Sequence, residues 1–465
     1  MIDTKTFDID EAPIWESLAT VGVAPDAARI REILAKGRVM KGLDADDIVP
    51  LMAVSDPELL AELFDTARFV KDNIYGRRLV IFAPLYVSNL CANECLYCAF
   101  RARNKEVVRR ALSQDEIARE TRVLIDQGHK RLLLVAGESY PKRGLQYILD
   151  AIATVYSVKN GNGEIRRVNV NIAPLTVEEF AALKGARIGT YQCFQETYHH
   201  ETYGQVHVAG KKADYHWRLQ AVDRAMAGGI DDCGIGALFG LFDWRFEMLA
   251  LMQHIRHLEA AFGVGPHTIS VPRIEPATGS AFAEHPPSPV DDLSFRKIVA
   301  ILRIAVPYTG IIMSTRETVE MRRETFALGV SQISGGSRTN PGGYAETARY
   351  DTSQFSLGDH RCLDDVVCDV AQLGYVPSFC TACYRLGRTG ADFMDLARPG
   401  DIKYHCDPNA VSTFQEYLMD YGTDESHAIG ERAIEASIAG MDEASARYSR
   451  VMVAKVKQGK RDVYR

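Results

Sequence analysis

Short apolar runs alternate with helix-like stretches between residues 77 and 345, and this alternation limits the possible folds more than any other feature of the sequence. Eight of these runs have the length and composition of buried strands. They are RRLVIFAPLYV (77–87), KRLLLVAG (130–137), RRVNVNIA (166–173), RIGTYQCF (187–194), DCGIGALFG (232–240), HTISVP (267–272), GIIMS (310–314) and GVSQIS (329–334). Eight strands alternating with helices predict an α/β fold of the (β/α)8 TIM-barrel type. A doubly wound open sheet is the alternative, but no GxGxxG motif follows a strand to support it.

Charge and hydropathy narrow the class of protein further. The chain of 465 residues has a net charge of -7, so no overall basic balance points to nucleic acid. No apolar run approaches the roughly 20 residues needed to span a bilayer. The acidic N-terminus lacks the apolar core of a signal peptide. We therefore expect a cytoplasmic protein with no nucleic-acid partner and no membrane partner.

The segments that flank the strand-rich region have a different character. Residues 55–76 are helix-like, with Ser55 as the expected N-cap, Glu58 three residues on and a closing Gly76. The last segment carries a cysteine-rich loop and then more helix-like sequence. We therefore expect a helical N-terminal leader at 1–76, a barrel at 77–345 and an appended, mostly helical cluster-binding domain at 346–465.

Ten cysteines occur in the sequence, and six of them fall into two close groups. In a reducing cytosol, closely spaced cysteines are more often metal ligands or catalytic groups than disulfides. The other four cysteines are scattered, and we expect them to be small packing residues: Cys193, Cys233, Cys362 and Cys368.

The first group, Cys91, Cys95 and Cys98, has the spacing CX3CX2C and directly follows the first expected strand. Three thiolates on a tight loop can hold three corners of a 4Fe-4S cluster, which leaves the fourth iron open. A structural zinc site normally takes four protein ligands, so a set of three favours chemistry over scaffolding. The barrel fold would place this loop on the face where barrel enzymes have their active sites.

With the aromatic Tyr97 before its last cysteine, this motif resembles the CX3CXΦC signature of the radical S-adenosylmethionine (SAM) superfamily. The resemblance implies that SAM binds the open iron and is cleaved reductively to methionine and a 5′-deoxyadenosyl radical. It also implies three further SAM contacts. Glu138, in an AGE version of the GGE turn, would bind the methionine ammonium, Glu196 the ribose, and Arg218 the methionine carboxylate. The alternatives are solvated loop carboxylates and a surface helix arginine.

The second group, Cys380, Cys383 and Cys406, lies near the other end of the chain. On spacing alone, a zinc site with a fourth ligand such as His405 is an alternative to a second cluster. This CX2CX22C pattern, GRTGADFM, and the blocks GIGALFGL, GPHTISVPR and STRE resemble the HydG family of FeFe-hydrogenase maturases over nearly the whole chain. The related thiamine-pathway tyrosine lyases, the ThiH family, share the barrel and the first cluster but lack the second.

The resemblance implies a radical SAM tyrosine lyase. Such an enzyme cleaves L-tyrosine between Cα and Cβ to p-cresol and dehydroglycine. It then breaks dehydroglycine down to CO and cyanide at a second 4Fe-4S cluster, which an extra iron can accompany. An electron donor and hydrogenase maturation partners are also implied. Two residues depart from the family pattern: Ala136, in place of the first glycine of GGE, and Glu275 in VPRIEPA.

A bidentate arginine suits the carboxylate of a tyrosine substrate. Arg316 lies just past the seventh expected strand, in Ser314-Thr315-Arg316-Glu317, and the arginine of the family takes the substrate carboxylate. The alternative is a helix-opening arginine paired with Glu317. We expect Ser314 and Ser334 as further substrate contacts.

His267 begins the sixth expected strand, which would place it at the bottom face of the barrel, where residues usually serve stability. The equivalent histidine of the family ligates an extra iron beside the second cluster, and a neutral imidazole is a suitable iron ligand. A core histidine is the alternative. The small residues Gly234, Gly236 and Ala237 lead to the further hypothesis of an open barrel interior.

Two other functions stay open from the sequence. A 2-iminoacetate synthase of thiazole biosynthesis would use the C-terminal segment only to stabilise its fold. A non-catalytic iron-sulfur carrier is the second alternative, and the expected SAM contacts argue against it.

Overall fold

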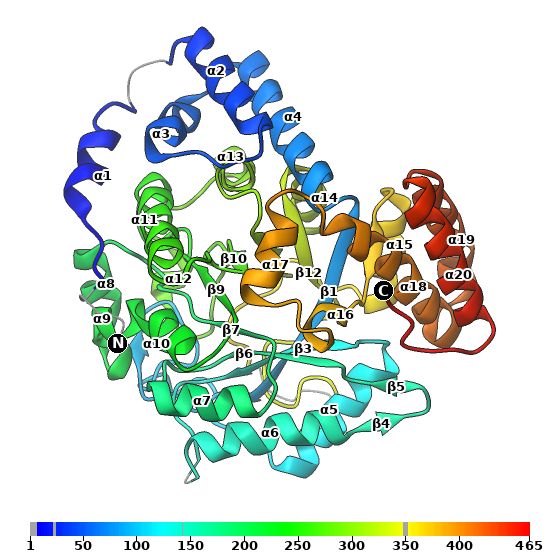
Figure 1. Ribbon diagram of the computed structural model, residues 1–465. Helices are drawn as coiled ribbons and strands as arrows, with labels where there is room; N and C mark the ends of the chain where they lie inside the picture. Colours follow the sequence, from blue (N-terminus) through cyan, green and yellow to red (C-terminus); the bar gives the residue numbers. More distant parts are fainter. Residues whose placement is uncertain (1–6, 22–24, 142, 347–351) are drawn as a thin grey trace.

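The computed structural model describes residues 7–21, 25–141, 143–346 and 352–465. Eight parallel strands form a closed barrel in the order β1-β3-β6-β7-β9-β10-β11-β12, and β12 pairs back to β1 (Figure 1). The strands are β1 Arg78–Ser88, β3 Arg131–Ala136, β6 Arg167–Asn171, β7 Thr190–Gln192, β9 Asp232–Gly236, β10 Thr268–Ser270, β11 Gly310–Met313 and β12 Val330–Ser334. All eight expected strands are present, so the predicted (β/α)8 barrel is confirmed.

Helices link the strands and surround the barrel. They are α5 Gln114–Asp126, α6 Leu145–Ser157, α7 Val177–Gly185, α10 Ala221–Ala227, α11 Trp244–Phe262, α13 Asp292–Ala305 and α14 Val319–Leu328. Local sequence sets where they begin, as in α5, where Ser113 and Glu116 form a capping box. The strands are buried, and the helices cover their outer faces.

Short elements build the top of the barrel, at the carboxyl ends of the strands. They are β2 Glu94–Cys95, α8 His200–Val206, β8 His207–Ala209, a 3-10 turn at Lys211–Ala213, α9 Tyr215–Leu219 and α12 Ala281–Glu284. Pairing of β2 with β8 joins the loop after β1 to the loop after β7. A separate two-stranded ribbon, β4 Lys159–Asn160 with β5 Gly163–Glu164, follows α6.

In the described ranges 7–21 and 25–77, four helices precede the barrel: α1 Glu11–Leu18, α2 Ala27–Arg38, α3 Ala45–Ala53 and α4 Pro57–Ile74. They lie along α11, α13 and α14 (Figure 1). The prediction of Ser55 as the α4 cap is wrong. The Asp56 carboxylate caps this helix instead, accepting from the backbone of Glu58 and Leu59, because Pro57 occupies the first helical position. Gly76, with φ of 63°, follows the helix as expected.

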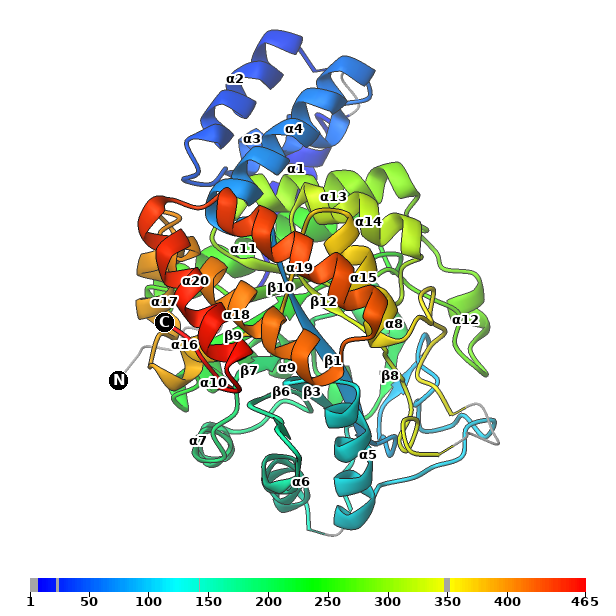
Figure 2. The same cartoon turned by 90° about the vertical axis from the view of Figure 1, so that its right-hand side faces the viewer.

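Residues 352–465 contain a strand and six helices: α15 Leu363–Gln372, β13 Val376–Ser378, α16 Ala382–Arg385, α17 Gly390–Ala397, α18 Lys403–Tyr421, α19 Asp424–Ala439 and α20 Glu443–Lys457. Strand β13 pairs in parallel with the first residues of β1, before β1 reaches β3. Figure 2 shows α15, α18, α19 and α20 packed together against this side of the barrel. Among the described residues, no helix combines the length and the apolar character needed to cross a membrane.

Candidate active site and metal centres

The first cysteine group lies on the loop that leaves β1 at the top of the barrel. The Arg109 guanidinium fixes this loop by donating to the backbone oxygens of Asn89 and Phe100, both at 2.9 Å. Burial raises the pKa of the Cys91 thiol to about 11, and it also raises the pKa values of Cys95 and Cys98. Thiols in this environment release their protons when a metal replaces them.

The spacing of the three thiols does not fit a single metal ion. Among the described residues, the sulfur atoms of Cys91, Cys95 and Cys98 do not all lie within 4.8 Å of one another, as ligands of one ion would. A 4Fe-4S cluster binds each thiolate at a separate corner and therefore holds its ligands farther apart. The Cys98 sulfur also accepts a hydrogen bond from the backbone of Phe100 at 3.4 Å.

Beside this loop, Glu138, which follows β3, meets Glu196 and Arg218, which both lie between β7 and β9, in one polar network. The Arg218 guanidinium donates to the Glu138 carboxylate at 2.8 Å and lies 3.6 Å from that of Glu196. Burial alone would raise the pKa of Glu138, but the charges of Arg218 and Lys212 lower it overall. The network thus presents carboxyl groups and a guanidinium, which suit the charged ends of an amino acid.

Two members of this network were missed from the sequence. Asn93 donates to Glu138 at 2.8 Å, and the Lys212 ammonium donates to Glu196 at 2.7 Å. The Lys212 backbone also donates to the Asn93 side chain at 3.0 Å. These contacts depend on the pairing of β2 with β8, so they could not be predicted from the local sequence.

Two backbone features support the same network. An added Cβ on Gly137 would lie 2.3 Å from the Leu90 oxygen, so only glycine allows this turn to pack against the cluster loop. Glu196 has a positive φ of 74°, an uncommon conformation for a residue with a side chain. Such conformations are concentrated at functional sites, where the surrounding structure maintains them. Tyr97, the aromatic residue of the first cysteine motif, lies nearby, and its hydroxyl is 2.8 Å from His207 Nε2.

A cavity opens from this network into the top of the barrel. Its lining residues include Tyr86, Tyr97, Cys98, Phe194, Glu196, Glu275, Ser314, Arg316, Ser334, Gln354 and Phe355. Cys98 of the first cysteine group and the three expected substrate contacts therefore line the same cavity. A small molecule in this cavity would lie between them.

Arg316 is the basic residue best placed to bind an anionic group in this cavity. Its guanidinium carbon lies 3.3 Å from the centroid of the Phe355 ring, which holds the guanidinium plane. Burial lowers the pKa of Arg316, and no carboxylate among the described residues forms an ion pair with it. The alternative pairing with Glu317 does not occur, because Glu317 binds Arg273 at 3.0 Å.

The two expected serine contacts also line the cavity, but backbone groups already use their hydroxyls. Ser314 accepts from the backbone of Arg316 at 3.3 Å, and Ser334 accepts from that of Thr315 at 3.1 Å. Both hydrogen bonds shape the turn that presents Arg316. Glu275 lines the same cavity, and burial together with the neighbouring Glu317 charge raises its pKa to about 7. The charge of this carboxyl group therefore changes with pH near neutrality.

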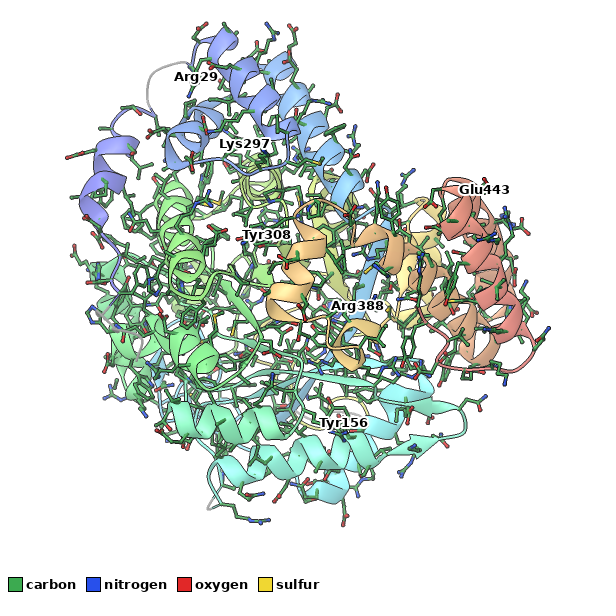
Figure 3. The ribbon with its side chains drawn as sticks, in the orientation of Figure 1. Arg29, Tyr156, Lys297, Tyr308, Arg388 and Glu443 are labelled. Atoms are coloured by element: carbon green, nitrogen blue, oxygen red, sulfur yellow. The ribbon has the colours of Figure 1, made fainter. Side chains whose placement is uncertain are left out.

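The second cysteine group lies against the opposite, bottom end of the barrel. Cys380, Cys383 and Cys406 line a separate cavity with residues that begin the barrel strands, among them Arg78, Arg131 and His267. A hydrogen bond from Cys383 and the charge of Arg78 lower the pKa of Cys406 to about 6. Arg388, labelled in Figure 3, lies on the loop between α16 and α17, in the C-terminal segment that carries these three cysteines.

His267 faces this bottom cavity, next to the second cysteine group. Burial lowers its pKa, so the imidazole is neutral, and its Nδ1 atom has no hydrogen-bond partner among the described residues. The closest carboxylate is Asp232, with Nδ1 and Oδ1 3.5 Å apart. A buried neutral imidazole with an unused nitrogen fits a metal ligand better than a satisfied core histidine.

The residues of the alternative zinc site are not gathered around one point. Among the described residues, no three ligand atoms from Cys380, Cys383, Cys406 and His405 come within 4.8 Å of one another. His405 also does not line the bottom cavity. The donor set of three thiols matches the three protein corners of a cubane.

The space beside the small residues of β9 is filled. An added Cβ on Gly234 would lie 2.5 Å from the Thr268 hydroxyl and 3.0 Å from the Gln192 side chain. One on Gly236 would lie 2.6 Å from the Ser270 oxygen. These glycines therefore allow neighbouring groups to approach one another closely.

The sequence and the structure resemble known radical SAM proteins. Residues 85–252 match the model of the Radical SAM superfamily, and residues 270–376 match the Biotin and Thiamin Synthesis associated domain. The 2-iminoacetate synthase of Escherichia coli (strain K12) is 33% identical over 339 residues, which cover 72% of this chain and 86% of that protein.

Two solved structures of FeFe-hydrogenase maturases are similar over almost their full length. One crystal structure of HydG has 45% identity and a TM-score of 0.94, and covers 98% of this chain and 99% of that chain. HydG from Carboxydothermus hydrogenoformans has 42% identity and a TM-score of 0.82, and covers 95% of this chain and 98% of that chain. The fold and the cysteine loop at its top thus define a radical SAM enzyme, a class that binds a 4Fe-4S cluster and SAM. Within that class, the chain belongs to the HydG family of FeFe-hydrogenase maturases.

Proposed function

We propose that this enzyme cleaves L-tyrosine between Cα and Cβ to p-cresol and dehydroglycine, and then forms CO and cyanide at its second metal centre. The products would serve assembly of the FeFe-hydrogenase active site, with hydrogenase maturation proteins as partners and an electron donor for the first cluster. The observation that carries this proposal is the presence of two cysteine groups at opposite ends of one barrel. Detection of both p-cresol and CO from tyrosine and SAM tests it.

The residues of the top cavity divide into two sets. Cys91, Cys95 and Cys98 would hold the 4Fe-4S cluster, which supplies the electron that cleaves SAM. We assign the SAM contacts to Tyr97, Glu138, Glu196 and Arg218, since a carboxylate suits the methionine ammonium, a second one accepts from the ribose hydroxyls, and the guanidinium suits the methionine carboxylate. Arg316 would bind the substrate carboxylate, and Ser314 and Ser334 would fix its turn.

At the bottom, Cys380, Cys383 and Cys406 would hold the second cluster, and His267 would bind an extra iron beside it. A 2-iminoacetate synthase is the second candidate, since that enzyme of Escherichia coli is similar to most of this chain. It would release dehydroglycine without making CO. The alignment of nearly the full length with HydG structures, and the cavity shared by the second cysteine group and His267, favour the first function.

Replacing Arg316 with Lys tests the assignment of the substrate carboxylate. Lys keeps the positive charge but loses the two parallel donors of the guanidinium. We expect tyrosine to bind more weakly by about 1–3 kcal/mol, the scale of a lost hydrogen bond to a charged group. Cleavage of SAM without tyrosine should be largely retained. An Arg296→Lys variant on α13 is the control, and an unchanged tyrosine affinity for Arg316→Lys would assign the carboxylate elsewhere.

Replacing His267 with Ala tests the role of the bottom cavity. The three thiols of the second group remain, so only a ligand of a peripheral iron is lost. We expect the CO yield to fall more than the p-cresol yield, because tyrosine cleavage takes place at the other end of the barrel. Both products are measured from the same reaction, together with the iron content. Equal losses of CO and p-cresol would show that His267 serves stability only.

A further inference from the structure

Asp8, His200 and His216 form a cluster of potential metal ligands to which neither cysteine group contributes. Their ligand atoms all lie within 4.8 Å of one another. His200 Nε2 is 2.9 Å from one Asp8 oxygen, and His216 Nε2 is 3.2 Å from the other. These spacings are close to the roughly 3.3 Å between ligands of a tetrahedral zinc ion with Zn–N bonds of about 2.0–2.1 Å.

The carboxylate of this cluster is presented by an ordered segment. Ile9 is buried, and the Phe7 ring stacks on His257 with ring centroids 3.9 Å apart. The Asp10 backbone donates to Gln253 at 3.0 Å. In Figure 1 this segment leads into α1 and lies beside α8 and α9. Asp8 is thus held in place by its neighbours, as a ligand of a pre-formed site must be.

His200 already has the support that histidine ligands of metals need. Its Nδ1 atom is 2.7 Å from Glu11 Oε1, and its backbone nitrogen donates to the same oxygen at 2.9 Å. The ring also packs against Tyr215, with centroids 4.2 Å apart. A carboxylate on Nδ1 fixes the tautomer and directs Nε2 toward a metal, the arrangement found around most metal-bound histidines.

We propose that Asp8, His200 and His216 bind a zinc ion, which ties the N-terminal segment to α8 and α9. Two imidazoles and one carboxylate suit zinc, whereas calcium and magnesium need more oxygen ligands. Water would complete the tetrahedron because all three side chains reach the surface. This site does not depend on the proposed function.

The site lies close in sequence to two residues of the SAM network. His200 comes four residues after Glu196, and His216 comes two residues before Arg218. Zinc bound here would join both segments to Asp8 and hold them in one arrangement. It would be a structural clamp at the top of the barrel, separate from the iron chemistry.

Zinc counting with the holoenzyme tests this proposal. Reconstituted protein with both clusters is dialysed against Zn²⁺ under anaerobic conditions, and bound zinc is measured. We expect wild type to hold one equivalent more than a His200→Ala/His216→Ala variant, while an exposed-histidine control, His285→Ala, matches wild type. Equal zinc in wild type and the double variant would overturn the proposal.

A milder substitution gives a test that does not depend on folding of the double variant. Glu11→Gln leaves all three ligands in place and removes the negative charge that the Glu11 carboxylate places beside His200 Nδ1. We expect zinc affinity to fall about 10–100-fold, the usual effect of such outer partners. Zinc should also slow proteolysis of residues 7–26 in wild type but not in His200→Ala/His216→Ala. Unchanged affinity in Glu11→Gln, or equal protection in wild type and the double variant, would contradict the clamp.

Discussion

Replacing Cys95 with Ala is expected to reduce 5′-deoxyadenosine formation to background. The change leaves two thiols on the loop after β1, too few for a cluster with three protein corners. Cys95 is buried and lies on β2, where no other cysteine can take its place. Without the cluster, SAM has neither its iron ligand nor its source of an electron, so p-cresol should disappear as well.

A cysteine outside both groups provides the control for this experiment. Cys362 caps α15 and is exposed, so Cys362→Ala should keep the wild-type rate of SAM cleavage. Thermal unfolding and iron content are measured for both variants to confirm that they fold. If Cys95→Ala formed 5′-deoxyadenosine at the wild-type rate, the first cysteine group would not hold the catalytic cluster.

The Cys380→Ala/Cys383→Ala double variant is expected to separate the two halves of the reaction. Only Cys406 remains at the bottom of the barrel, and one thiol cannot hold a cubane. Tyrosine cleavage requires the top cavity alone, so p-cresol should persist while CO falls to background. Cyanide should persist at a reduced level, because dehydroglycine decomposes without complete assistance from iron.

Iron counting and spectroscopy of the first cluster show whether this variant remains intact at the top. A folded variant that keeps the first cluster but makes no p-cresol would show that the two sites are not separable. A variant that makes CO at the wild-type level would reduce the second cysteine group to a structural role. The 2-iminoacetate synthase function would then be favoured.

The barrel could be predicted from the sequence because its parallel strands are buried on both faces. Such strands appear as continuous apolar runs, and every run that was identified became a barrel strand. The cysteine loop was equally predictable, since all three residues lie on one short segment. The cap of α4 was less certain, because Ser55 and Asp56 are adjacent and both are good N-caps.

Contacts between distant segments could not be predicted in this way. Asn93 and Lys212 join the SAM network only because β2 pairs with β8, and neither residue lies in a recognisable motif. The absence of an Arg316–Glu317 pair depends on Arg273, which is far away in the sequence. Likewise, Asp8 meets His200 and His216 only after the N-terminal segment docks on the barrel.

The most direct test of the proposed function is product analysis of the reconstituted wild-type enzyme. The protein is loaded anaerobically with iron and sulfide, reduced, and given L-tyrosine and SAM. p-Cresol and CO are quantified from the same reaction. We predict that both products form and that CO depends on tyrosine. Release of p-cresol with no CO, from protein that carries both clusters, would contradict a hydrogenase-maturase reaction and support a 2-iminoacetate synthase.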